Sequence, residues 1–231
     1  MVVDVILLAG GYGKRLKPIT DFVPKCLAPI SGRPLLDIWL ETLKHPKVSQ
    51  VLINTHFFSA KVGEFVKTKK MNNVTLFYEK DLLGTAGTIR KLIKFIDADF
   101  VFVAHADNLS IFDLNQFFIK FYERPKNIIG TMMLFKTKNP ENCGIVKTDK
   151  EGIITEYYEK NSARKGNLAN GAVYIFDKIA LKHHLREDDY DFSADTINRI
   201  FPFMNTFENK NLHIDIGTVP DFLAAQYMIK T

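Results

Sequence analysis

Apolar runs alternate with amphipathic stretches over the first half of the chain. The run 2–9 is apolar at every position except Asp4, and three glycines follow it within four positions. A continuous apolar run that ends in a turn is typical of a buried parallel strand. The same pattern predicts strands at 50–55, 74–80 and 100–106, and helices at 35–44, 59–69, 85–96 and 113–124. Helices between strands imply right-handed crossovers, so we expect an α/β fold with a mainly parallel sheet that has helices on both faces.

The pattern changes after Arg124. The apolar runs become short and are separated by turn residues such as Asn139 and Pro140, which favours antiparallel strands. These strands are expected at 128–136, 144–148, 153–159 and 172–176. A last strand is expected at 212–216 and a helix at 218–229, where Thr218 and Asp221 have the spacing of a capping box. No linker rich in Gly, Ser or Pro divides the halves, so we expect one domain, 1–231, with a β-rich lobe in its second half.

Composition narrows the class of protein without identifying it. Of the 231 residues, 46% are hydrophobic and 25% are charged, as in ordinary globular domains, which excludes collagen-like, disordered and coiled-coil chains. The formal net charge is +5, but no run of five like charges occurs, so a nucleic-acid-binding tail is not expected. No apolar run approaches the roughly 18 residues of a membrane span. Cys26 and Cys143 fit neither a disulfide framework nor a CxxC metal site, and the first residues lack the basic n-region and the cleavage site that are typical of a signal peptide. We therefore expect a cytoplasmic protein that binds neither membranes nor nucleic acids; its aromatic residues could line a homo-oligomer interface, but the sequence does not locate one.

The first strand leads into a loop that is suited to phosphate. The segment 7–36 is LLAGGYGKRLKPITDFVPKCLAPISGRPLL. Its glycines allow backbone amides to approach a ligand closely. Positive charge gathers in the same segment, at Lys14, Arg15, Lys17 and Lys25. The segment is not a dinucleotide fingerprint, because the third glycine is missing, and it is not a P-loop, because no GK[ST] follows.

This segment resembles the N-terminal motif of the sugar-1-phosphate nucleotidylyltransferases, L-A-G-G-x-G-[ST]-R-L-x-P-x-T followed by P-K-P and P-[IV]-x-G-[KR]-P. The resemblance implies a Rossmann-like, GT-A-like nucleotide-diphospho-sugar transferase fold. It also implies catalytic roles for Arg15, at the pyrophosphate leaving group, and for Lys25, at the phosphates in the reacting centre. Lys14 stands where Ser or Thr is usual, and Cys26, expected to be a small buried residue, replaces the second proline. The loop residues expected to wrap the nucleoside triphosphate are Leu8, Ala9, Gly10, Gly11, Gly13 and Lys14.

A second cluster, YEKDLLGTAGTIRK at 78–91, suggests a binding site for a base. Gly84, Thr85 and Gly87 open a predicted helix, where small residues let a planar group approach and free amides point outward. A helix N-cap at Thr85 with packing glycines is the alternative interpretation. The resemblance assigns E-x-x-x-L-G-T-A-G to base recognition, with Glu79 facing the base, and this version is typical of guanylyltransferases. GTP is therefore the favoured donor.

Two aspartates are candidate ligands of a divalent ion. Asp107 follows an apolar strand in FVFVAHADNLS, and ligands of open α/β sheets bind at such strand ends. Carboxylates are suitable ligands for Mg²⁺, although an aspartate at this place is also often a helix cap. The resemblance pairs it with Asp215 in LHIDIGTVPDF, so that Mg²⁺ would lie between the two substrates' phosphates.

The second half of the chain supplies the expected acceptor site. TEYYEKN at 155–161 resembles V-x-E-K-P, with Asn161 in place of proline, and LANGAVYIF at 168–176 resembles N-A-G-x-Y-x-F, with Gly171 and Ala172 in swapped order. In the family the glutamate and asparagine contact the sugar and the lysine binds its phosphate. The residues expected to bind the sugar phosphate are Asn108, Gly144, Glu159, Lys160 and Asn170.

Together these motifs predict nucleotidyl transfer from a nucleoside triphosphate to a sugar 1-phosphate. Residues 1–124 would mainly bind the nucleotide, and 125–231 the sugar phosphate. Short guanylyl-type members that make GDP-D-glycero-α-D-manno-heptose are most similar, with mannose 1-phosphate as the competing substrate. Uridylyl or cytidylyl transfer, including transfer to phosphocholine, is the alternative within the fold. A catalytically silent nucleotide-sugar-binding regulatory module is the alternative outside enzymes.

Overall fold

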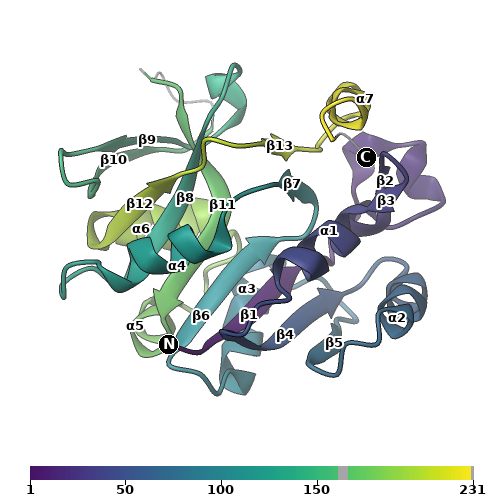
Figure 1. The fold of residues 1–231 in the computed structure, drawn as a ribbon, viewed down its shortest axis with the longest axis horizontal. Helices are drawn as coiled ribbons and strands as arrows, with labels where there is room; N and C mark the ends of the chain where they lie inside the picture. Colours follow the sequence, from purple (N-terminus) through teal and green to yellow (C-terminus); the bar gives the residue numbers. More distant parts are fainter. Residues whose placement is uncertain (161–165, 230–231) are drawn as a thin grey trace. The chain divides into compact units, whose positions relative to one another are not determined.

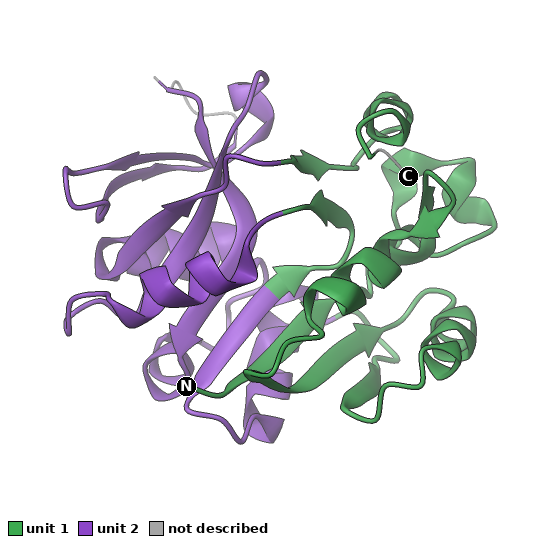
Figure 2. Ribbon diagram, in the orientation of Figure 1, with its two compact units in different colours: residues 1–82, 104–111, 212–231 green, residues 83–103, 112–211 purple. Residues whose placement is uncertain are grey.

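The computed structural model describes residues 1–160 and 166–229. The chain forms two compact units, each assembled from segments that are distant in sequence (Figure 2). Unit 1 takes residues 1–82, 104–111 and 212–231, and unit 2 takes 83–103 and 112–211. The proposed division of binding roles at residue 124 follows a different boundary and stays a prediction.

Unit 1 is built on three parallel strands. β1 (Val3–Leu8) pairs with β4 (Val48–Thr55), and β4 pairs with β5 (Val74–Tyr78). Helices α1 (Leu35–Thr42) and α2 (Ser59–Thr68) lie between these strands in the sequence (Figure 1). All six residues of β1 are buried, which requires cover on both faces of the strand. The predicted α/β fold with parallel strands is confirmed.

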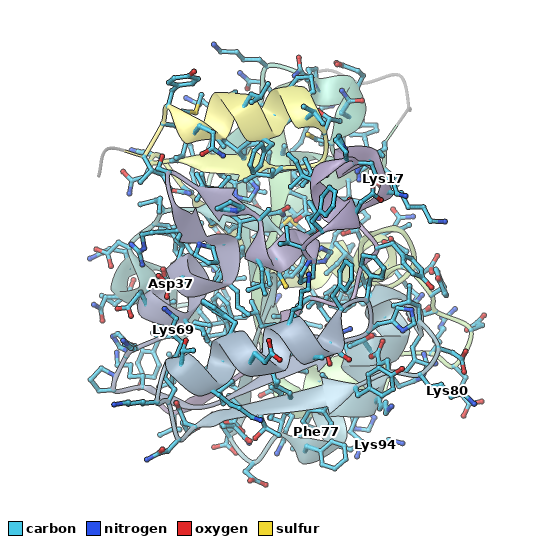
Figure 3. All side chains as sticks on the ribbon, turned by 90° about the vertical axis from the view of Figure 1, so that its right-hand side faces the viewer. Lys17, Asp37, Lys69, Phe77, Lys80 and Lys94 are labelled. Carbon is cyan, nitrogen blue, oxygen red and sulfur yellow. The ribbon has the colours of Figure 1, made fainter. Side chains whose placement is uncertain are left out.

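Ion pairs join the start of α1 to the end of α2. The carboxylate of Asp37 contacts Lys69, and Arg33 donates to it from 2.9 Å (Figure 3). Burial alone would raise the pKa of Asp37, but the hydrogen bonds from Lys69 and Arg33 outweigh it and lower the pKa. Asp37 therefore stays ionised and stabilises this side of unit 1. The N-cap of α2 is Phe58, which has φ of 54°, and Ser59 is the first residue of the helix.

The segment after β1 packs against the C-terminal part of the chain. It contains 3₁₀ turns at Lys14–Leu16, Ile19–Asp21 and Lys25–Leu27, and a hairpin of β2 (Pro29–Ile30) and β3 (Arg33–Pro34). Leu16 and Ile30 share a buried cluster with Ile216 and Ala225. This core fixes the phosphate-binding segment against the last elements of unit 1.

The last strand forms outside the parallel sheet. β13 (His213–Asp215) pairs antiparallel with β7 (Asn108–Ser110), and Asp215 is opposite Asn108. α7 (Val219–Gln226) follows, and the Oγ1 atom of its N-cap Thr218 accepts a hydrogen bond from the backbone N–H of Asp221, as the capping-box spacing predicted. Asp107 directly precedes β7, so this pairing brings the backbone of the two candidate metal ligands, Asp107 and Asp215, close together.

Unit 2 contains a mostly antiparallel sheet. Its antiparallel strands are β8 (Gly130–Lys136), β9 (Ile145–Thr148), β10 (Ile154–Tyr158) and β11 (Leu168–Asp177). β11 pairs with β8 and with β9, and β9 pairs with β10, all antiparallel as expected. β12 (Met204–Glu208) pairs parallel to β8 and was not predicted. The unit also contains α3 (Gly84–Leu92), α4 (Leu114–Tyr122), α5 (Lys178–His184), a π-helix (Phe192–Ile197), α6 (Asn198–Ile200) and most of β6 (Phe100–His105), whose end belongs to unit 1.

Across the described ranges 1–160 and 166–229, no helix has the length and apolar character needed to cross a membrane.

Candidate active site

The glycine loop follows β1 and is held by the end of β4. The backbone N–H of Ala9 donates to Asn54 Oδ1 at 2.7 Å. A Cβ atom at Gly10 would lie 2.6 Å from Asn54 Nδ2, and one at Gly13, where φ is +63°, would lie 3.1 Å from Lys25 Cβ. At Gly11, by contrast, a Cβ would meet nothing within 4 Å. Protein packing therefore explains Gly10 and Gly13, and Gly11 is the glycine of the loop that faces open space.

The predicted catalytic lysine meets both predicted metal ligands within unit 1. Lys25 is 8% exposed, and its Nζ donates to Asp107 Oδ2 at 2.8 Å and to Asp215 Oδ1 at 3.4 Å. A Cβ built on Gly217 would lie 3.2 Å from Arg15 Nη2 and 3.4 Å from both carboxylate oxygens of Asp215. Arg15 and Asp215 thus border the same point, and the structure brings Arg15, Lys25, Asp107 and Asp215 together.

These charges stabilise one another. Burial alone would lower the pKa of Lys25, but the carboxylates of Asp107 and Asp215 outweigh it and raise the pKa. For Asp107, burial alone would raise the pKa, but Lys25 and His105 lower it. Lys25 and Asp107 are therefore both ionised at neutral pH. Burial raises the pKa of the neighbouring Cys26 to about 12, so its thiol is no nucleophile and its predicted role as a small buried residue fits.

The donor atoms of this cluster fit a magnesium ion by their chemistry. Two carboxylates from different segments of the chain contact one cation, the Lys25 ammonium. Carboxylate oxygens are also the ligands that Mg²⁺ prefers, and Mg²⁺ in proteins keeps several water ligands. In the part of the chain that the structure describes, no group of three or more His, Cys, Asp or Glu side chains could hold a metal. Asp107 and Asp215 would supply two positions, and water and phosphate oxygens the others.

Two histidines beside the aspartates were not predicted as part of the site. His105 Nδ1 lies 4.0 Å from Asp107 Oδ1, and His213 Nδ1 lies 2.7 Å from Ser110 Oγ. Burial lowers the pKa of His213 to about 4, so this ring is neutral. Each histidine precedes its aspartate by two positions, and this repeated H-x-D spacing is the signal that could have found the pair.

Two further candidates of unit 1, Asn108 and Glu79, are buried, whereas Lys14 of the glycine loop is exposed. Asn108 is 8% exposed, and its backbone oxygen accepts a 2.9 Å hydrogen bond from Trp39 Nε1. Glu79, directly after β5, is 1% exposed, and its backbone N–H donates to the Thr55 oxygen at 2.8 Å. The structure thus fixes the backbone of both residues, and the role of Glu79 at the base stays a prediction.

The start of α3 is covered by residues 190–192 of the same unit. Gly84 has φ of +73°, and a Cβ there would lie 2.3 Å from the Tyr190 oxygen, which accepts the Ala86 N–H at 3.0 Å. The N-cap of α3 is Leu83, and Thr85 Oγ1 accepts the Phe192 N–H at 2.7 Å. The interpretation of Thr85 as the N-cap is therefore wrong, because its hydroxyl holds the neighbouring segment. A Cβ at Gly87 would meet Leu83 Cβ at 3.0 Å, which identifies Gly87 as a packing glycine.

Three of the predicted sugar-binding residues meet around Tyr157 in unit 2. The Tyr157 hydroxyl donates to Glu159 Oε2 at 3.0 Å and accepts from Asn170 Nδ2 at 3.3 Å. A Cβ at Gly144 would lie 2.7 Å from the same hydroxyl. Lys160 is exposed, and its backbone N–H donates to Glu159 Oε1 at 2.9 Å. Asn161 lies outside the described residues.

The amide of Asn170 is bonded inside the protein. Its Nδ2 also donates to the Tyr174 hydroxyl at 2.8 Å, and its Oδ1 accepts the Ala172 N–H at 2.9 Å. The Tyr174 hydroxyl lies 3.2 Å from Ser193 Oγ. Burial raises the pKa of Tyr157 and of Tyr174, so both phenols stay protonated. Asn170 thus organises a hydroxyl cluster. Two of its members, Tyr157 and Tyr174, lie within the acceptor motifs, and no pattern along the chain pointed to Ser193.

Curated relatives resemble this chain over nearly its whole length. D-glycero-α-D-manno-heptose 1-phosphate guanylyltransferase of Aneurinibacillus thermoaerophilus is 27% identical over 227 residues, which cover 96% of this chain and 96% of that protein. Mannose-1-phosphate guanylyltransferase catalytic subunit beta of Xenopus tropicalis is 28% identical over 236 residues, 96% of this chain. The chain spans 63% of the length of the Xenopus protein and 62% of a Sulfolobus acidocaldarius relative that is 28% identical.

The fold and a family model agree with these relatives. The crystal structure of HddC from Yersinia pseudotuberculosis complexed with GMP-PN has a TM-score of 0.80 and 25% identity, and covers 98% of this chain and 99% of HddC. The family model described as nucleotidyl transferase matches residues 4–231, a range that contains the glycine loop and both candidate aspartates. With the predicted charged residues gathered in unit 1, this match confirms the resemblance, and the chain belongs to the nucleotidyl transferase family.

Proposed function

We propose that the protein transfers a nucleotidyl group from GTP to a sugar 1-phosphate and releases pyrophosphate. The observation that carries this proposal is that Lys25 contacts both Asp107 and Asp215. Arg15 and the glycine loop lie next to this group of charges. Fixed cations of this kind stabilise charge that develops on phosphate oxygens during in-line displacement. A binding module would need no such arrangement of opposite charges.

The chain's own residues account for most of the chemistry. An oxygen of the sugar phosphate attacks the α-phosphorus, and no general base is needed, because a phosphate monoester with a second pKa of about 6 is mostly dianionic at neutral pH. Lys25 would contact the phosphates of the reacting centre, and Arg15 the departing pyrophosphate. Mg²⁺, held by Asp107 and Asp215, would neutralise the two anions as they meet. Positioning and charge neutralisation then supply the rate enhancement.

In unit 2 we assign the acceptor to the cluster around Tyr157. Glu159 would accept hydrogen bonds from sugar hydroxyls, and the exposed Lys160 would bind the sugar phosphate. Residues 1–124 would then bind mainly the nucleotide and 125–231 mainly the sugar phosphate. The cytoplasmic location and a homo-oligomeric state remain predictions.

We infer D-glycero-α-D-manno-heptose 1-phosphate as the acceptor. The Aneurinibacillus relative supports this choice, because this chain spans 96% of that protein. The Xenopus relative supports mannose 1-phosphate as the second candidate. A Synechocystis relative named UTP–glucose-1-phosphate uridylyltransferase, 28% identical over 242 residues, is the reason to test other bases.

A matrix of triphosphates and acceptors tests the proposal. GTP, UTP, CTP and dTTP are each combined with manno-heptose, mannose and glucose 1-phosphates and with phosphocholine, and pyrophosphate release is measured. We expect the highest kcat/KM for GTP with the heptose phosphate, and loss of this release in Asp107→Asn but not in Asp99→Asn, an exposed aspartate away from the cluster. Absence of release with every pair would contradict an enzymatic role.

A further inference from the structure

Tyr12, in the middle of the glycine loop, is bonded to a histidine that the mechanism does not use. The Tyr12 hydroxyl lies 2.9 Å from His56 Nε2, and His56 directly follows β4. Position 12 is the open position of the loop motif, so the resemblance assigns it no role. Both residues belong to unit 1.

The second nitrogen of His56 fixes the direction of this hydrogen bond. His56 Nδ1 lies 2.8 Å from the backbone oxygen of Glu79. A carbonyl oxygen can only accept, so Nδ1 carries the hydrogen. In the tautomer with its hydrogen on Nδ1, Nε2 accepts from the Tyr12 hydroxyl. The chain of hydrogen bonds therefore runs from Tyr12 through His56 to the residue that follows β5.

The Tyr12 ring is also packed, although the residue is 42% exposed. Its ring lies edge-on to His56, with 5.1 Å between centroids, and tilted against Phe57 at 5.7 Å. Lys14 Nζ lies 5.4 Å from the Tyr12 ring centroid. Tyr12 thus anchors a loop whose flanking residues are glycines, which have no side chains to hold them and lose the most conformational freedom when ordered.

We propose that Tyr12 and His56 are positioning residues that hold the glycine loop at a fixed place relative to the backbone of Glu79. This inference rests on the proposed nucleotide site, because it joins the loop assigned to the phosphates to the strand end assigned to the base. A loop that is already ordered loses less conformational entropy when the nucleotide binds. The hydrogen bond between Tyr12 and His56 therefore strengthens triphosphate binding. The sugar phosphate gains nothing from this contact.

Three variants separate this role from a general structural one. Tyr12→Phe keeps the ring and removes the hydroxyl, and His56→Asn retains an amide donor for the Glu79 oxygen but does not reach Tyr12. Each is expected to weaken binding of the α,β-methylene analogue of GTP about 5-fold, the effect of one hydrogen bond. The double variant should lose no more than either single variant, because one chain of hydrogen bonds is broken in all three. Tyr122→Phe, an exposed tyrosine of α4, is the matched control.

Two further measurements complete the test. KM for the triphosphate should rise with the dissociation constant, while KM for the sugar phosphate changes less than 2-fold. Hydrogen exchange should accelerate at the amides of residues 9–14 in Tyr12→Phe and remain unchanged in β1. If the wild-type protein binds no triphosphate analogue, the proposed function fails. If wild type binds it and Tyr12→Phe binds equally well, or if both KM values rise alike, the positioning role is overturned.

Discussion

The Lys25 ammonium donates a 2.8 Å hydrogen bond to Asp107, although 82 positions separate the two residues in sequence. A second carboxylate, that of Asp215, lies 3.4 Å from the same nitrogen. The lysine therefore occupies the point that a divalent ion between these carboxylates would share. An ion bound there would compete with the ammonium for the same oxygens.

Replacing Lys25 by Met should separate its two effects. Turnover should fall by about 100-fold or more, because a fixed cation is lost at the reacting phosphates. Binding of Mn²⁺ without nucleotide, followed by calorimetry, should become tighter, because no ammonium competes for the carboxylates. Lys126→Met, an exposed lysine, should change neither quantity. Unchanged or weaker Mn²⁺ binding in Lys25→Met would contradict the competition.

The stability of unit 2 should depend on pH through Asp189. Arg199 donates to this carboxylate at 2.7 Å, and so does the Thr196 hydroxyl. Burial alone would raise the pKa, but these hydrogen bonds lower it to about 2 from 3.8. A lowered pKa stabilises the folded state above the unfolded value, and this contribution is lost as pH falls from about 4 to about 2.

Asp189→Asn is the variant that tests this dependence. It should lower the free energy of unfolding by about 2 kcal/mol at pH 7, and the difference from wild type should shrink as pH falls through that window. Urea unfolding at several pH values measures both quantities. The exposed neighbour Asp188 gives the control Asp188→Asn. A difference that does not depend on pH would argue against the ion pair.

Replacing Ala172 by glycine should stabilise the folded protein. Its φ is +52°, in the left-handed region, where a Cβ atom costs about 1 kcal/mol. The free energy of unfolding of Ala172→Gly should therefore rise slightly, by up to about 1 kcal/mol. Ala169→Gly, in the extended part of β11, should have the opposite effect, because glycine weakens a strand interior. Two changes of the same sign would contradict the conformational explanation.

The KM for the sugar phosphate should depend on Asn170, even if Asn170 does not contact the sugar phosphate itself. Asn170→Ala removes the donor to both Tyr157 and Tyr174, so Glu159 loses the support of its partner hydroxyl. KM for the sugar phosphate should rise about 10-fold, whereas KM for the triphosphate should stay within 2-fold. Steady-state kinetics with each substrate varied in turn measures the difference. Asn142→Ala, an exposed asparagine, is the control, and equal effects on both KM values would rule out an acceptor-specific role.

Local patterns predicted the parts of the fold that depend on neighbouring residues. The buried β1 and the capping residue Thr218 follow from periodicity and short-range hydrogen bonding. β12 was not predicted because its residues MNTFE show no regular alternation of apolar and polar positions, and its parallel partner β8 lies far away in sequence. The alternative interpretation of Thr85 as an N-cap failed because its hydroxyl accepts the backbone N–H of Phe192, which lies 107 positions away in sequence.

The candidate site divides in the same way. The motifs, through the family resemblance, pointed to Lys25, Asp107 and Asp215, and the structure brings these three residues together. They did not find the bond between Tyr12 and His56 or the cluster of Tyr157, Tyr174 and Ser193. Uncharged side chains of this kind acquire a function only through the contacts that the fold gives them.

The interleaved segments of unit 1 have a consequence for synthesis. Asp215 lies 190 positions after Lys25, on a segment that begins at residue 212, when all segments of unit 2 have already been translated. A nascent chain halted before that point would carry Lys25 and Asp107 without their second carboxylate, and would leave Leu16 and Ile30 without Ile216 and Ala225. The charged centre of unit 1 is therefore among the last features of the molecule to be completed, because its second carboxylate is translated after every segment of unit 2.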